Sequence, residues 1–327
     1  MKILVLGGTR FIGRHLVAEC LARGDDLTVL YRGHSPSPFA GLARHILTDR
    51  RAPTAEARAV LSEPWDVVID TSAVDLDDVT PLTPLLTDVG RYVFVSSCAV
   101  YRRQFTTSTL REQSPTIVAD TTDPTRASAT RKLRCERHLR GRARRTGIPL
   151  LVARLGLVVG KHDYSHRFTY WLEHVLRGGE ALVPMDPDQP VQIIDASDVA
   201  KFLRDAVDRD VEGIVNVAGR SITAQNLIEA LLDRSPQPPV PCWVGERYAR
   251  SQRVRPWTEV PLWLTNDSPE RALMAVDSSR ALAAGLTYRS LRDTIDDCLA
   301  WHTVRRSWSQ RWLDPAREQH LIQQWRA

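Results

Sequence analysis

Short, mostly apolar runs alternate with amphipathic stretches along the first 155 residues. The runs predict strands at residues 3–6, 27–31, 44–49, 67–70, 92–96 and 150–153. Between them, Phe11 to Leu21 repeats apolar residues at helical spacing up to Gly24, and an Arg-rich helix is expected from about Thr125 to Thr146. Strands that alternate with helices pair in parallel through right-handed crossovers. The pattern therefore predicts an α/β fold with a doubly wound parallel (Rossmann) sheet.

Beyond residue 160 the pattern is looser. We expect helices at 170–176, 198–207 and 318–325, a strand at 191–194, and an irregular connection at the Pro- and Arg-rich segment 235–261. These features suit a smaller C-terminal substrate domain. We expect residues 1–157 to form the nucleotide-binding domain, with 187–220 and about 276–300 returning to it, and 158–186 and 221–327 to form mainly the substrate domain.

Composition narrows the class of protein. With 43% hydrophobic and 25% charged residues the chain is typical of soluble globular proteins. Of its 44 basic residues 40 are arginines, but most are interleaved with acids, and the run from Arg134 to Arg145 is interpreted as the solvated face of a helix, so no nucleic-acid partner is expected. The five cysteines form no CxxC pair, which argues against zinc and disulfides.

No apolar run is long enough for a membrane span, and the N-terminus enters a strand without room for a signal peptide. We therefore expect a cytoplasmic protein without a membrane partner, as a monomer or homodimer.

The most informative segment is the turn Gly7-Gly8-Thr9-Arg10-Phe11-Ile12-Gly13, which lies between the first strand and the first helix. A dinucleotide pyrophosphate needs backbone N–H groups at a helix N-terminus and no Cβ atom in its way. Gly7 permits the tight turn, and Gly13 lets the helix lie close to the sheet. In this strand-turn-helix context the turn predicts dinucleotide binding.

The end of the second strand indicates which dinucleotide is bound. NAD-binding proteins place an acid there for the ribose 2′-hydroxyl, whereas NADP-binding proteins favour an arginine. Here the strand ends Leu30-Tyr31-Arg32-Gly33 without an acid. Arg32, helped by Arg10, is expected to pair with the 2′-phosphate, so NADP(H) is the predicted cofactor.

Several motifs together resemble the extended (atypical) short-chain dehydrogenases/reductases, which are NAD-dependent epimerase/dehydratase-like proteins. The turn is similar to their GxxGxxG pattern, with Arg10 in place of the middle glycine. The likeness continues through Val95–Tyr101, Arg154–Gly160 and Asp195–Ala200. It implies that Asp49 and Arg50 border the adenine and that Thr71, Ser72 and Ala73 line the cofactor. It also implies that the segment containing Leu155, Gly156 and Leu157 passes under the nicotinamide.

The resemblance implies a catalytic set, and this chain departs from it. Ser97 matches the family serine after the fifth strand, and Lys132 matches the lysine of Tyr-x-x-x-Lys, which also clamps the nicotinamide ribose. Four residues before Lys132 stands Ser128, where the family has its proton-transferring tyrosine. Since no tyrosine occurs between Tyr101 and Tyr164, a shifted register does not restore the motif.

Three interpretations follow. In the first, the protein is an NADP(H)-dependent reductase of a small, imine- or enone-like or aromatic metabolite, and its proton comes from water, Lys132, Tyr101, Tyr164 or His166. In the second, it performs redox-neutral chemistry, as an epimerase, dehydratase or cyclase does. In the third, catalysis is lost and an NADP-binding sensor or scaffold remains. The first is favoured because Ser97 and Lys132 are retained, and specialised (secondary) metabolism is a context suggested by association alone.

The substrate side is less defined. Residues 161–171 are dense in aromatic and hydrogen-bonding groups, which suits a pocket wall. The expected substrate residues are Tyr101, Tyr164, His166, Trp171 and Gln192, with Trp257 and Trp263 as further candidates. His162 and His166 stand four residues apart but lack a third ligand at a clear spacing, so no metal is expected.

Overall fold

The computed structural model describes residues 1–102, 109–118, 126–235, 237–305 and 312–327, with the side chains of 303–305 excepted. Its centre is a seven-stranded sheet in the order β10-β6-β5-β4-β1-β2-β3, in which every neighbouring pair is parallel. The strands are β1 (Lys2–Leu6), β2 (Asp26–Tyr31), β3 (Arg44–Leu47), β4 (Trp65–Asp70), β5 (Val89–Ser97), β6 (Leu150–Leu155) and β10 (Gly213–Val217). The doubly wound α/β prediction is confirmed.

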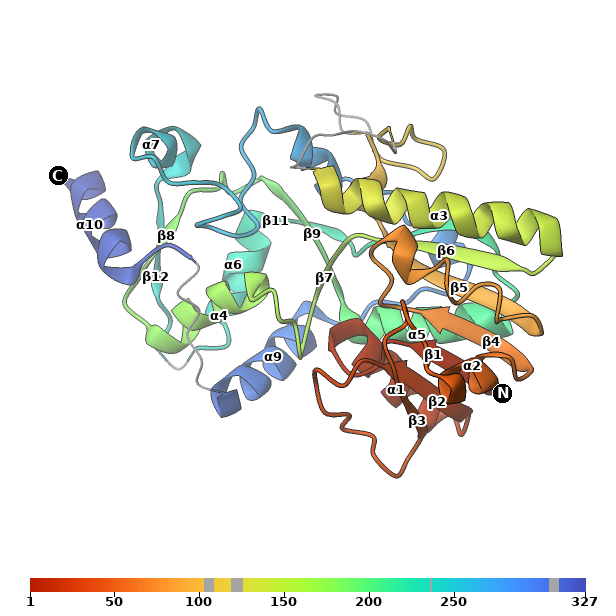
Figure 1. Ribbon diagram of the computed structural model, residues 1–327. Coiled ribbons are helices and arrows are strands. Elements are labelled where there is room, and N and C mark those ends of the chain that lie inside the picture. Colours follow the sequence, from red (N-terminus) through yellow and green to blue (C-terminus); the bar gives the residue numbers. More distant parts are fainter. Residues whose placement is uncertain (103–108, 119–125, 236, 306–311) are drawn as a thin grey trace.

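Helices cover both faces of this sheet because successive strand residues point to opposite sides. On β1, Ile3 and Val5 belong to one core, which includes residues of α1 (Phe11–Ala22) and α5 (Ala196–Asp208). Leu4 and Leu6 belong to the other core, under α2 (Ala55–Leu61) and α3 (Ala127–Thr146). Figure 1 shows α3 along one face of the sheet and α1 and α5 along the other.

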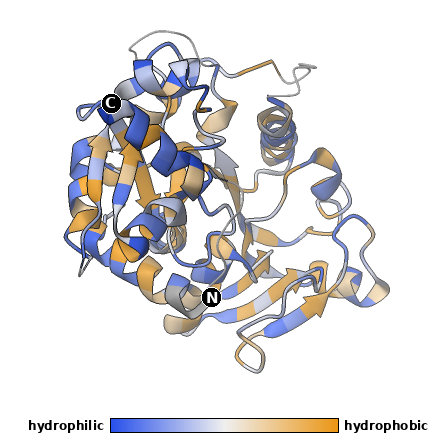
Figure 2. Ribbon diagram, turned by 90° about the vertical axis from the view of Figure 1, so that its left-hand side faces the viewer, coloured by the Kyte–Doolittle hydropathy of each residue, from blue (hydrophilic) through white to orange (hydrophobic). Residues whose placement is uncertain are grey.

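A third core holds the smaller part of the molecule together. It is built around two short sheets, β11-β9-β7 and β12-β8, and the helices that pack on them. The elements are β7 (Leu157–Val159), β8 (Glu180–Val183), β9 (Pro190–Asp195), β11 (Ser221–Thr223), β12 (Val240–Trp243), α4 (Arg167–Arg177), α6 (Ala224–Leu232), α7 (Gly245–Ser251), α9 (Leu291–Arg305) and α10 (Pro315–Arg326). Hydrophobic colour concentrates on the inner strands, whereas the outer helices carry both colours (Figure 2).

Buried polar contacts fix the C-terminal helix to this part. The Glu318 carboxylate on α10 is 1% exposed and faces His174 Nε2 at 2.8 Å. It also accepts from the backbone N–H of Leu182, at 2.9 Å, and pairs with Arg177 at 2.6 Å. Three partners from α4 and β8 therefore hold one side chain of α10.

The structure differs from the sequence-based expectation in one segment. Segment 235–261, expected to be irregular, contains β12 and α7. Strand β12 is only four residues long and contains Pro241, so its pattern gives little signal. Residues of α9 pack into the third core, whereas Ala281 of the short helix α8 (Ser279–Ala283) belongs to the core beneath α1 and α5.

Candidate functional site

The glycine turn closes the carboxyl end of β1 against the start of α1. Gly7 has φ of +84°, and a Cβ there would lie 2.4 Å from the Cβ of Ser72. A Cβ on Gly13 would lie 2.8 Å from the backbone oxygen of Gly7, which cannot move without reshaping the turn. Close backbone approach therefore requires glycine at both positions. This is the cradle that the sequence predicts for a pyrophosphate.

The N-terminus of α1 has no side-chain cap. Its N-cap residue is Arg10, which has no acceptor to offer, and no acid lies in the first turn. The first N–H groups of the helix thus remain available beside Thr9, Arg10, Phe11 and Ile12. A phosphate is the ligand that satisfies such groups and the positive end of the helix dipole together. The residues present fit a dinucleotide.

The carboxyl end of β4 forms the floor beside the turn. Thr71 donates its hydroxyl to the backbone oxygen of Gly7 at 2.8 Å, and Ser72 donates to that of Leu6 at 3.1 Å. Ala73 follows, with its backbone N–H donated to Asp70 at 3.0 Å. The three residues expected to line the cofactor are therefore brought against the glycine turn.

Arg50 lies in a buried ion pair beneath this floor. Its two Nη atoms donate to the carboxylate of Asp70 at 2.9 and 2.5 Å, Nη1 also donates to Ser72 at 2.8 Å, and Nε donates to the backbone oxygen of Asp78 at 2.6 Å. Burial opposes the charge of Asp70, but Arg50 holds the pKa of Asp70 below its ordinary value. Arg50 was expected beside the adenine; the structure commits it to supporting Ser72.

The residues expected at the adenosine end lie on the surface. Arg32 follows β2 and is exposed, and Asp49 follows β3 and is also exposed. Asp49 accepts the backbone N–H of Arg51 at 2.9 Å. Both side chains stand at the carboxyl ends of neighbouring strands, which is the edge at which ligands bind to open α/β sheets.

Lys132 lies at the carboxyl ends of β4 and β5. Its Nζ donates to the backbone oxygens of Ala73 and, at 2.7 Å, Val95. Burial lowers the pKa of Lys132 below its ordinary value. Ser97, two residues beyond Val95, accepts the backbone N–H of Ala99 at 3.2 Å, and Ser128 lies exposed one turn before Lys132 on α3.

A buried polar network continues from this site across β6 and β10. Glu136 pairs with Arg154 at 2.6 Å and accepts the hydroxyl of Ser96 at 2.5 Å. The Arg154 guanidinium lies over the ring of Tyr101, whose hydroxyl donates to Asn216 at 2.6 Å. Tyr101 is fully buried, and burial raises the pKa of Tyr101 to about 12. Its hydroxyl is thus engaged within the protein and is a weak acid.

The expected substrate residues are dispersed. Trp171 is buried and donates its indole N–H to the backbone oxygen of Pro261 at 3.0 Å. The side-chain amide of Gln192 is hydrogen-bonded to the backbone of Gly219 and Val276. His166 is the left-handed N-cap of α4, with φ of +57°.

Two further candidates differ in their surroundings. Trp263 is fully buried, whereas Trp257 lies under the guanidinium of Arg167. Tyr164 is 57% exposed and lies at the glycine turn, against Arg10 and Phe11.

The segment expected beneath the nicotinamide follows β6 closely. Leu155 is buried at the end of β6, and Leu157 is half-buried at the start of β7. A Cβ on Gly156 would lie 2.7 Å from the Cβ of Ala218. Close packing against β10 thus explains the glycine.

Sequence reasoning missed Asp70 and Asn216 as parts of the site's framework, whereas Glu136 follows Lys132 as in relatives that read K-x-x-x-E. Asp70 carried a usable signal, because an acid directly after Val67-Val68-Ile69 stands at the end of a buried strand and needs a partner. The sequence contains no such signal for Asn216, since its contacts come from segments distant in sequence, including Tyr101 and the backbone oxygen of Leu110.

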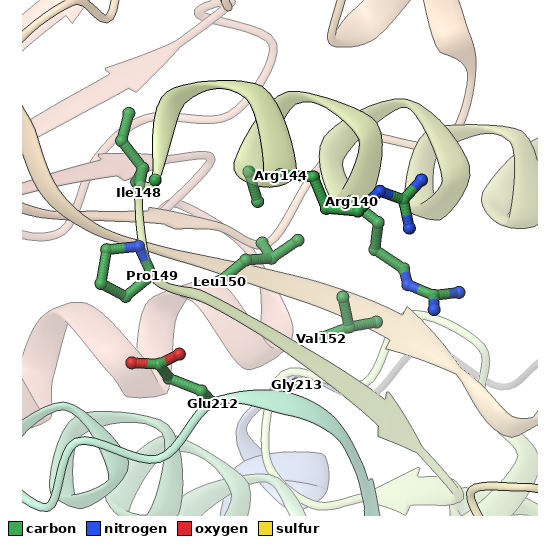
Figure 3. Close-up of a pocket in the computed structure, with 10 residues that line it drawn as sticks. Arg140, Arg144, Ile148, Pro149, Leu150, Val152, Glu212 and Gly213 are labelled. Carbon is green, nitrogen blue, oxygen red and sulfur yellow. The ribbon is translucent and has the colours of Figure 1, made fainter.

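Two hollows among the described residues can be assigned a lining. One, of about 360 Å³, is lined by residues of the C-terminal half of α3 and the starts of β6 and β10, including Arg140, Arg144 and Glu212 (Figure 3). It opens at the amino end of the strands, opposite the edge that binds ligands in such folds. The other, of about 110 Å³, lies beside Asp195, Asp198 and Arg289.

Among the described residues, no group of three or more His, Cys, Asp or Glu side chains is arranged to hold a metal ion. Within the same ranges, no helix is long and apolar enough to cross a bilayer.

Comparison with known proteins identifies the family. The model of the NAD dependent epimerase/dehydratase family matches residues 3–87 and 85–218. The chain belongs to this family, and its fold is the family's NAD(P)-binding fold, as the resemblance of its motifs implied.

Three individual proteins illustrate the relationship. The chain is 25% identical over 246 residues to the chloroplast stem-loop binding protein of 41 kDa b of Arabidopsis thaliana (70% of this chain, 62% of the relative). It is 27% identical over 227 residues to the 2′-dehydrokanamycin reductase of Streptomyces kanamyceticus (67% and 62%). The matches thus span less than two thirds of either relative. The structure of a Thermus thermophilus UDP-glucose 4-epimerase in complex with NAD is similar with a TM-score of 0.66, at 19% identity over 93% of this chain and 99% of that one, which shows a shared fold.

Proposed function

We propose that this protein is an NADP(H)-dependent oxidoreductase of the short-chain dehydrogenase/reductase type that acts on a small metabolite. The proposal rests on the edge of the sheet where β1 and β2 end. The N-terminus of α1 has no side-chain cap, is lined by glycines and has Arg10 beside it. The residue after β2 is Arg32, and no acid stands there. An arginine fork recognises a 2′-phosphate, whereas NAD binding uses an acid at that position. A relative whose name is that of a reductase supports the same activity.

The cofactor would extend along the carboxyl edge of the sheet. The turn from Gly7 to Gly13 would hold its phosphates, and Arg32 and Asp49 would border the adenosine. Thr71, Ser72 and Ala73 would line the middle, and Leu155, Gly156 and Leu157 would lie under the nicotinamide. When bound, the cofactor supplies or accepts the hydride.

Lys132 is the proton donor that the geometry favours in place of the missing tyrosine. Two backbone oxygens orient its ammonium group, which leaves one N–H for a substrate oxygen or nitrogen. Burial lowers the pKa of Lys132, so the group releases its proton more readily than an exposed lysine does. Ser97 would orient the substrate, whereas Ser128 is short, exposed and a weak acid. An iminium or conjugated alkene, which needs little acid assistance, suits this site.

Redox-neutral chemistry is the second candidate. The family match supports it, and an epimerase or dehydratase returns its hydride to the substrate or product, so no net cofactor is consumed. Stopped-flow mixing separates the two when the NADPH-loaded protein meets carbonyl, imine and enone compounds and the NADP⁺-loaded protein meets hydroxyl-bearing compounds. A reductase consumes NADPH in proportion to reduced product. Isomerised or dehydrated product formed with NADP⁺ and without net NADPH accumulation would establish the second candidate, and tight cofactor binding with neither outcome would leave a sensor or scaffold.

A further inference from the structure

The strap formed by residues 160–166 joins β7 to α4 and passes the start of α1 (Figure 1). Tyr164 lies near its middle. The Arg10 guanidinium is 4.3 Å from the centre of the Tyr164 ring, and the ring meets that of Phe11 edge-on at 6.2 Å. A residue of the segment between β7 and α4 thus contacts two residues of the phosphate-binding turn.

The strap is fixed to the nucleotide-binding domain through His15 on α1. Nε2 of His15 donates to the backbone oxygen of Lys161 at 3.0 Å, and Nδ1 lies 3.1 Å from the hydroxyl of Ser197. Burial lowers the pKa of His15, which favours a neutral ring that donates from Nε2 and accepts from Ser197. The ring of His162 lies beside those of His15 and Trp301, at 5.7 and 5.6 Å. These contacts join α1 to α9 through the strap.

The backbone of the strap is strained on both sides of Tyr164. His162 and His166 have φ of +68° and +57°, in the left-handed region that non-glycine residues seldom occupy. Between them, the buried Asp163 accepts the N–H of Ser165 at 2.8 Å and the hydroxyl of Ser165 at 2.8 Å, which secures the bend. Strain retained by surrounding contacts is a common property of ligand clamps. In the strap, the strained backbone places the exposed ring of Tyr164 against Arg10.

Among the residues that the structure describes, Arg10 has no anionic partner. Within the described ranges no carboxylate pairs with it, whereas Arg23, Arg50 and Arg51 in the same domain are all paired. A guanidinium that lies over an aromatic ring still has N–H groups to donate to a phosphate. A side chain already ordered in this way loses less conformational freedom when the phosphate arrives.

We infer that Tyr164 is a positioning residue of the cofactor site, which holds Arg10 over the phosphate-binding turn and closes that end of the dinucleotide cleft. This inference rests on the proposed NADP(H) function and assigns Tyr164 to the cofactor instead of the substrate. It predicts that the ring acts through Arg10, so removal of the ring weakens phosphate binding and leaves recognition of the adenosine unchanged.

The test is a calorimetric titration with NADPH of the wild-type chain and of Tyr164→Ala, Tyr164→Phe and Trp325→Ala. The last removes an exposed ring from α10, away from the turn. Tyr164→Ala is expected to raise the Kd for NADPH about three- to tenfold, whereas Tyr164→Phe and Trp325→Ala stay within about twofold of wild type. Adenosine, which lacks phosphates, should bind all four proteins equally.

An Arg10→Ala background completes the test. There, Tyr164→Ala should change the Kd no further, because its partner is gone. An unchanged Kd for Tyr164→Ala in the wild-type background, or an equal loss in the Arg10→Ala background, would overturn the inference while leaving NADP(H) binding intact. If the wild-type chain binds neither NADPH nor NADH, the proposed function itself fails.

Discussion

Replacing Arg50 with alanine removes the cation from a fully buried ion pair. Arg50 is 6% exposed and Asp70 is 0% exposed, so the variant leaves a carboxylate in the interior without its counter-charge. Breaking a buried pair in this way costs about 3–5 kcal/mol of the free energy of unfolding. At about 1.5 °C per kcal/mol for a chain of this length, we expect Tm to fall by about 4–8 °C.

The neighbouring arginine supplies a matched control. Arg51 also pairs with an aspartate, Asp78, at 2.7 Å, but its side chain is 50% exposed. Solvent screens such a pair, so Arg51→Ala should leave Tm nearly unchanged. Urea denaturation and thermal melting measure both variants. Equal Tm values for Arg50→Ala and the wild type, or a larger loss for Arg51→Ala, would refute the reasoning.

The pH dependence adds a second check. Because the folded-state pKa of Asp70 lies below its unfolded value, the pair stabilises the fold above the unfolded pKa, near 4, and loses its effect as pH falls through the folded pKa. Without Arg50, burial raises the pKa of Asp70 above its unfolded value, so the difference in stability between wild type and Arg50→Ala should grow as pH rises from about 4 and shrink below it. Four of the five guanidinium N–H groups of Arg50 point to protein acceptors, so NADPH affinity well below Tm should change little.

Three further predictions concern the site and its surroundings. Gly13→Ala places a Cβ 2.8 Å from the backbone oxygen of Gly7, so calorimetry should show NADPH affinity reduced by about 100-fold or more, while circular dichroism still reports a folded chain. Lys132→Met should reduce kcat for NADPH oxidation by at least about 100-fold, whereas Ser128→Ala should retain turnover; the reverse order would exclude Lys132 as the proton donor. Burial raises the pKa of Asp198 to about 6, so the ionised carboxylate destabilises the fold as pH rises from about 4 to 6. Asp198→Asn should therefore stabilise the protein by about 1–2 kcal/mol at pH 7, a range that allows for the partial exposure of the side chain. Urea denaturation at pH 4 should show no gain in stability.

The sequence was sufficient to predict the large sheet because its strands are interior ones. Buried on both faces, β1 and β4 contain the continuous apolar runs Ile3–Leu6 and Val67–Ile69, and the glycine turn carries its own steric requirement. Short strands gave no comparable signal. In β12 the four residues include a proline, and the pairing with β8 depends on contacts far along the chain.

The same difference, between local sequence signals and contacts of distant segments, separates the site residues. Thr71 and Ser72 follow a buried strand directly, so their place beside the turn follows from local sequence. The family resemblance implied that Arg50 borders the adenine, and its ion pair with Asp70, 20 residues away, is a contact that sequence spacing alone does not reveal. Tyr164 is a further case: its contact with Arg10 joins segments more than 150 residues apart.

Calorimetric titration of the wild-type chain with NADPH and NADH is the most direct test of the central claim. The account predicts at least about tenfold tighter binding of NADPH, and loss of that preference in Arg32→Ala, because the guanidinium pairs with the 2′-phosphate. Equal or tighter binding of NADH by the wild-type chain would contradict it.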